Sequence, residues 1–82
     1  MRKSEWTKMA CRTDRDKAAI LSWFAPLCDD MVPEEAHVLC DIETDREKKL
    51  KVLMVDANGK RRWAIRTRGQ KTFSITLKPV RQ

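Results

Sequence analysis

The sequence predicts a small α+β protein in which one amphipathic helix, kinked or broken by a proline, packs on an antiparallel β-meander of three or four strands. Two observations lead to this prediction. An apolar stripe of helical period follows residue 13, and runs of alternating apolar and polar residues, separated by turn residues, fill the second half of the chain. One face of such a sheet can bury the helix stripe, which gives a two-layer arrangement.

The length of 82 residues predicts a single small domain spanning residues 1–82. A chain this short buries about 60–65% of the surface that its unfolded form exposes, so it has room for one core and one binding surface. Residues 1–12 show no clean periodicity, and we interpret them as a basic arm. Trp6 offers an alternative, since it can instead anchor a strand.

A helix is predicted to begin at Thr13, whose hydroxyl suits a cap and which is followed by acids in the first turn. Pro26 lacks the N–H that a helix interior needs, so we expect a kink or break near Ala25. The Val32-Pro33-Glu34-Glu35 segment is interpreted as the opening of a short second helix. The apolar stripe recurs at intervals of four, three and four residues, through Ile20, Phe24, Leu27 and Met31.

Alternating residues predict the strands. Val38, Cys40 and Ile42 indicate a half-buried strand from His37 onward. Two stronger candidates flank Asn58-Gly59, which is the preferred pair for a two-residue type I′ hairpin turn. A further turn at Arg68-Gly69 leads to a last strand that Pro79 ends.

The alternation also assigns side chains to faces. We expect Trp63 and Ile65 to face the core together with the apolar residues of the last strand, Phe73, Ile75 and Leu77. The outward face then carries cations interleaved with hydroxyls, namely Lys49, Lys51, Arg62, Arg66, Lys78, Thr72, Ser74 and Thr76. If the faces were reversed, Trp63 with Arg61 and Phe73 with Lys71 would form a stacking surface. We favour the first assignment because the helix stripe needs apolar partners.

Charge is segregated along the chain. The net charge is +6, but residues 48–82 carry eleven basic and one acidic side chain, whereas residues 18–47 carry one basic and eight acidic ones. Cations with hydroxyls suit phosphate, so the sequence predicts a non-catalytic nucleic-acid-binding protein, either RNA-binding or DNA-binding, with a role as a small regulator. The turns add two basic tips at residues 59–62 and 66–71. The predicted contact residues are Lys49, Lys51, Lys60, Arg61, Arg62, Arg66, Arg68 and Lys71, with Arg2, Lys3 and Lys8 of the arm as additions.

The acidic segment, residues 29–47, supports an alternative. A negative patch beside exposed apolar residues such as Met31, Val32 and Leu39 can bind a basic protein, so the alternative prediction is a protein-interaction module or inhibitor that acts through residues 29–47. A free edge strand also makes a dimer a reasonable expectation.

Several function classes are disfavoured. The three cysteines, Cys11, Cys28 and Cys40, are widely spaced and form no Cys-x-x-Cys pair, so we expect free thiols and no metal. His37 is the sole histidine, without a motif that would make it a general base, and two glycines cannot form a phosphate-binding loop. We therefore expect no enzyme activity and no cofactor. No apolar run suits a membrane span or a signal peptide, so a cytoplasmic protein is expected.

Overall fold

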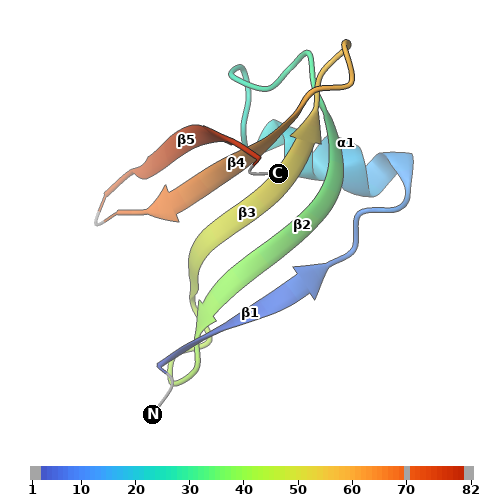
Figure 1. Ribbon diagram of the computed structural model, residues 1–82. Helices are drawn as coiled ribbons and strands as arrows, with labels where there is room; N and C mark the ends of the chain where they lie inside the picture. The colour runs from blue at the N-terminus through green and yellow to red at the C-terminus, as the bar shows by residue number, and fades with distance from the viewer. Residues whose placement is uncertain (1–2, 70, 81–82) are drawn as a thin grey trace.

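The protein is a helix packed on a five-stranded antiparallel sheet (Figure 1), so the α+β prediction is confirmed. The structure, a computed structural model, describes residues 3–69 and 71–80. The strands follow one another across the sheet in the order β1-β2-β3-β4-β5. The sheet therefore has more strands than the three or four expected. The elements are β1 (Ser4–Met9), α1 (Asp14–Ser22), β2 (Val32–Asp41), β3 (Glu47–Val55), β4 (Arg61–Arg68) and β5 (Phe73–Pro79).

The additional strand is β1. Ser4–Met9 does not form an arm, as the sequence prediction had it, but pairs along β2 with Trp6 opposite Leu39. A β2 of ten residues leaves an edge long enough for this pairing. The alternative for Trp6, that it anchors a strand, is the one that the structure shows. Arg2, which was added to the basic arm, lies outside the described residues.

The helix begins as predicted and ends earlier. The Thr13 hydroxyl accepts a hydrogen bond from the Asp16 amide at 3.0 Å, and the Asp16 carboxylate accepts one from the Thr13 amide at 3.5 Å, which together form a capping box. The helix ends at Ser22, and turns follow through residue 30, with Pro26 among them. The expected break near Ala25 is thus only roughly matched. Phe24 and Cys28 remain fully buried although they lie beyond the helix.

The short second helix predicted at Val32-Pro33-Glu34-Glu35 is wrong, because these residues open β2. Pro33 is buried and pairs with Met54 at a register shift between Pro33 and Glu35. A proline is tolerated in a strand at such a bulge, where its missing N–H removes no regular ladder bond. The strand expected from His37 onward is therefore the second half of a longer one.

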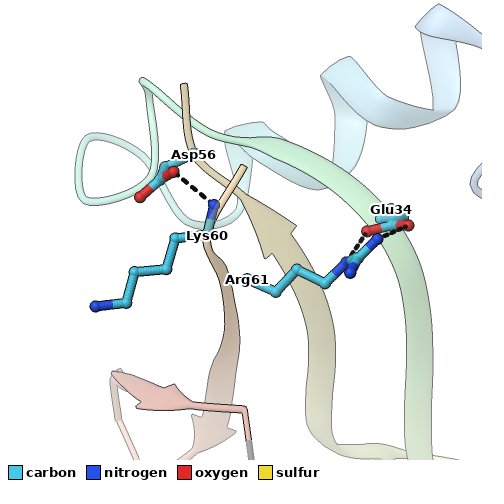
Figure 2. A network of polar contacts seen from close by, with 4 residues as sticks. All are labelled: Glu34, Asp56, Lys60 and Arg61. Atoms are coloured by element: carbon cyan, nitrogen blue, oxygen red, sulfur yellow. Dashed lines mark hydrogen bonds and ion pairs between the residues drawn. The ribbon is translucent and has the colours of Figure 1, made fainter. Parts of the chain in front are cut away.

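The hairpin at Asn58-Gly59 is confirmed, but its turn is of another type. The Gly59 amide donates to the Asp56 carbonyl at 3.0 Å, and Gly59 has φ 80 whereas Asn58 has no positive φ. This is a three-residue loop in which a type I turn is followed by a left-handed glycine, in place of a type I′ turn. The Asp56 carboxylate accepts hydrogen bonds from the backbone amides of Asn58 and Lys60, both at 2.9 Å; Figure 2 shows the one from Lys60.

The turn type decides which way β4 faces. A two-residue turn at Asn58-Gly59 would pair Met54 with Trp63, on the core side. The additional loop residue moves the register by one, so that Met54 pairs with Arg62 and Leu53 with Trp63. A shift of one residue exchanges the faces of a strand. Trp63 and Ile65 therefore point away from the core, and the prediction that they face it is wrong.

The core lies between the sheet and the helical segment, on what we call the covered face; Figure 1 shows α1 behind the sheet. Phe73, Ile75 and Leu77 of β5 are on this face, as predicted, since Leu77 pairs with the buried Ala64. The buried residues are Ile20, Phe24, Cys28, Met31, Ala36, Leu50, Val52, Met54 and Ala64. Within residues 3–69 and 71–80, no helix is long and apolar enough to cross a membrane.

Candidate nucleic-acid interface

The opposite side of the sheet, which we call the open face, has no helix packed against it in the described part of the chain. Residues that pair directly across an antiparallel sheet share a face, so the register places side chains in rows. Members of all five strands contribute to the open face: Ser4, Trp6, Lys8, Val32, Glu35, His37, Leu39, Asp41, Lys49, Lys51, Leu53, Val55, Arg61, Trp63, Ile65, Thr67, Ser74, Thr76 and Lys78.

Lys51 lies at the centre of the open face. It pairs with His37 on β2 and with Ile65 on β4. Its ammonium is 4.3 Å from the centroid of the Trp63 ring, which is a cation–π contact. At a partly exposed site such a contact contributes about 0.5–1 kcal/mol. Lys51 and Trp63 therefore form one unit with a cation above an indole face.

Two shallow hollows meet at this unit. One, of about 250 Å³, is lined by Trp6, His37, Lys51 and Trp63. The other, of about 360 Å³, is lined by Lys51, Trp63, Ile65, Lys78, Pro79 and Val80. Sites that enclose a whole small molecule usually measure about 300–1,000 Å³ and are concave. Both hollows are open to solvent, which suits a planar group resting on the surface better than an enclosed substrate.

Four lysines make the open face electropositive. Lys49 and Lys51 lie there as the sequence predicted, and Lys78 and Lys8 join them. The register places two carboxylates on the same face: Asp41, which accepts hydrogen bonds from the Glu43 and Thr44 amides, and Glu35, whose oxygen is 3.6 Å from the His37 Nε2 atom. Ser74 and Thr76 add hydroxyls on β5. Cations next to hydroxyls and exposed aromatic rings can bind a phosphodiester chain.

Arg62 and Arg66 are not part of this surface. They pair with Met54 and Leu50, whose side chains are buried in the core, so both arginines lie on the covered face. The Arg66 guanidinium is 3.6 Å from the Phe73 ring centroid and 3.9 Å from a Glu47 oxygen. The predicted cationic face that combined these arginines with Lys49 and Lys51 is therefore wrong. The physical reason is the one-residue register shift at the Gly59 turn.

The first basic tip is partly neutralised. Arg61 reaches across β3 to β2, where its Nε and Nη2 atoms donate to the two Glu34 oxygens at 3.0 and 3.3 Å (Figure 2). This hydrogen bond lowers the pKa of Glu34 and raises the pKa of Arg61. Lys60 is exposed in the turn. Arg61 is thus engaged with a carboxylate, and Lys60 is the freer cation of this tip.

The second basic tip carries Arg68 and Lys71, both exposed, at a turn in which the Gly69 amide donates to the Thr72 carbonyl at 2.8 Å. Gln70, between them, lies outside the described residues. The two tips lie at opposite ends of β4, which at about 3.3 Å per residue places them about 23 Å apart. They cannot grip one phosphate together, although a long strand of nucleic acid could touch both.

The thiols of Cys28 and Cys11 are not activated for nucleophilic chemistry. Burial raises the pKa of Cys28, with Asp30 and Asp29 adding to the effect, and burial also raises the pKa of Cys11. A raised pKa leaves less of the nucleophilic thiolate at neutral pH. Cysteine, histidine and carboxylate side chains form no group of three that could hold a metal ion in the part of the chain that the structure describes.

Sequence reasoning missed the contributions of β1 and of His37 to the open face. Trp6 and Lys8 were assigned to an arm, although their spacing of two residues already fits one face of a strand. Trp63 entered only through the reversed-face alternative, and the structure supports that alternative for Trp63 but not for Phe73. The number of residues in the turn at Asn58-Gly59 decides on which face of the sheet Trp63 lies, and the sequence indicates that number only weakly.

Comparison with known proteins adds no functional information. No protein-family model matches this chain, and neither the curated proteins nor the solved structures searched contain a match.

Proposed function

We propose that this protein is a non-catalytic nucleic-acid-binding protein that contacts phosphates through the lysines of the open face. The observation that carries the proposal is the gathering of Lys8, Lys49, Lys51 and Lys78 on one uncovered sheet face beside two tryptophans. Lys49 and Lys51 keep the role expected from the sequence. Lys8 and Lys78 take the place of Arg62 and Arg66.

The lysines are close enough to act together. Lys49 and Lys51 are two residues apart on β3, about 7 Å, and Lys8 is two strands from Lys51, about 10 Å. Both separations are within about one screening length of 8–10 Å at moderate salt, so the potentials of Lys49 and Lys8 add to that of Lys51. Lys78 is two strands and two residues from Lys51, about 12 Å, and adds less. The basic tips extend this field at both ends of β4.

Salt dependence tests the proposal. If all four lysines contact phosphates of a single strand, the logarithm of the binding constant falls with a slope of about −3 against the logarithm of salt concentration. Affinity then drops about 50-fold between roughly 50 and 200 mM salt. Fluorescence anisotropy with labelled oligonucleotides measures this directly. No binding at low salt, or binding that salt does not weaken, would refute the proposal.

A matched pair of double variants tests the face. Lys49→Gln with Lys51→Gln removes two charges from the open face, and Arg62→Gln with Arg66→Gln removes two from the covered face. Both lower the net charge equally, so a general charge effect is the same in each. We expect the lysine variant to lose most of its affinity and the arginine variant to retain it, with circular dichroism confirming that both fold. Equal losses would show that the open face is not the site.

A protein partner is a second candidate function, and one observation favours it. Trp23, Leu27 and Val32 are 39%, 49% and 53% exposed, and in the sequence they lie on either side of the exposed Asp29 and Asp30. Met31, which the sequence analysis expected to be exposed in this segment, is buried. Apolar side chains with a negative rim fit a basic protein surface. A partner that survives nuclease treatment should then be lost in Asp29→Asn with Asp30→Asn and kept in the arginine variant. If the arginine variant alone loses the partner, this candidate fails.

A further inference from the structure

We propose that the open face selects single-stranded nucleic acid, because Trp63 and Trp6 stack on unpaired bases. This inference rests on the proposed function and specifies its ligand. Phosphate contacts alone do not distinguish a single strand from a duplex. Stacking does, since the flat faces of paired bases are covered by their neighbours in a helix and are free only when the bases are unpaired.

The indoles are placed for stacking. Trp6 is 47% exposed on β1 although it is a large apolar side chain, and Trp63 projects from β4 on the same face. Both line the 250 Å³ hollow together with His37 and Lys51. A sheet that presents exposed aromatic rings between cations is the arrangement by which proteins bind single strands with little sequence preference.

Lys51 links base stacking on Trp63 to phosphate binding. Its ammonium lies 4.3 Å from the centre of the Trp63 ring, over one of the two faces of the indole. A base that stacks there displaces the ammonium, which can then turn to the phosphate of the same nucleotide. Loss of an exposed cation–π contact weakens binding about 2- to 5-fold, whereas stacking of one base strengthens it about 5- to 140-fold. The exchange is therefore favourable.

The spacing of the indoles sets the length of the ligand. Three ladder steps of about 4.8 Å and four residues of about 3.3 Å along β3 separate their backbone positions by about 20 Å on a flat sheet. Both side chains nevertheless reach one hollow of about 250 Å³, so the rings lie closer together than their backbone positions, and a short strand of a few nucleotides can contact both. Affinity should rise with the number of nucleotides until the strand spans from Trp63 to Trp6. Beyond that length it should rise only because a longer strand offers more equivalent binding positions.

The test compares a single strand with a duplex of the same length on the full chain at one salt concentration. The probes are a labelled oligothymidylate of about 12 nucleotides, within the range of known single-strand sites, and a duplex formed from it with its complement. We expect the single strand to bind at least about 10-fold more tightly. Trp63→Ala and Trp6→Ala should each weaken single-strand binding about 5- to 140-fold and change duplex binding little.

Two variants serve as controls. Trp23→Ala removes an exposed indole that ends α1 on the covered side, and it should bind as the wild type does. Trp63→Phe retains an aromatic face and should restore most of the binding lost in Trp63→Ala. Trp63→Ala should also leave the salt slope unchanged, whereas Lys51→Gln should make it shallower by about 0.7.

The outcomes separate this inference from the proposed function. Equal binding of duplex and single strand that still depends on Lys49 and Lys51 would overturn the single-strand inference and leave the proposed function standing. Wild-type affinity in Trp6→Ala and Trp63→Ala would overturn it too. Absence of binding to either probe at low salt would refute both proposals.

Discussion

Ala64→Leu and Trp63→Leu together test which side chains of β4 lie on the covered face and which lie on the open face. Ala64 is fully buried, with Val52 opposite on β3 and Leu77 opposite on β5. Leucine adds three carbon atoms at a position that the neighbours already fill. Trp63 lies on the open face, where leucine keeps an apolar contact and loses the Lys51 cation–π contact.

The expected magnitudes differ clearly. Overpacking a filled core costs about 1–3 kcal/mol, which is a large share of the roughly 4–12 kcal/mol expected for a chain of this length. At about 4–8 °C for each kcal/mol, Ala64→Leu should lower Tm by about 4–24 °C. Trp63→Leu should cost about 1 kcal/mol or less, since it removes a partly exposed contact and leaves no enclosed cavity.

Urea unfolding followed by far-ultraviolet circular dichroism measures both variants. This signal does not depend on tryptophan fluorescence, which Trp63→Leu changes. An unchanged m value would show that the two variants differ in stability and not in the unfolded state. If Trp63→Leu cost several kcal/mol and Ala64→Leu almost nothing, then Trp63 would be the core residue and the one-residue register shift would be refuted.

Three further predictions concern the turn, the helix cap and one ion pair. Gly59→Ala should destabilise the protein by about 1–2 kcal/mol, because its φ is 80 and the new Cβ meets no atom within 4 Å, so that backbone strain alone acts; an unchanged urea midpoint would contradict this. Thr13→Ala should cost about 1 kcal/mol by removing the acceptor for the Asp16 amide, whereas Thr13→Ser should be nearly neutral, as thermal unfolding can show. The pKa of Glu34 is lowered by Arg61, so its contribution to stability is present above the ordinary value of 4.5 and is lost as pH falls through the lower folded-state pKa. Arg61→Gln should therefore make stability less sensitive to pH below 4.5, and an acid-side profile identical to that of the wild type would count against the pair.

Local patterns in the sequence were sufficient for several features. The capping box at Thr13 depends on residues three apart, and the turn at Gly59 needs a residue that tolerates positive φ. The alternation of β3 and β5 correctly predicted which side chains of those strands lie on the covered face, although Phe73 at the start of β5 is 46% exposed and only Ile75 and Leu77 of that strand pack against the core. Each of these features depends on neighbours along the chain, which is why it could be recognised without the fold.

Other features depend on partners distant in the sequence. Ser4–Met9 becomes a strand only because the edge of β2 is free to pair with it. Pro33 is accommodated in β2 by a bulge against β3, which no pattern around Pro33 indicates. Long-range pairing thus overrode the local preference in both places, adding β1 and replacing a predicted helix.

The basic meander, residues 48–78, shows most clearly which features the sequence determined and which the tertiary structure decided. The sequence by itself determined that residues 48–78 form strands, that they are rich in cations and that a hairpin turns at Asn58-Gly59. Only the tertiary structure decided which cations act together, because one additional residue in the turn moved the register of β4 and exchanged its faces. That exchange separates Arg62 and Arg66 from Lys49 and Lys51, and it brings Trp63 out of the core to lie beneath Lys51 on the face that we propose binds nucleic acid.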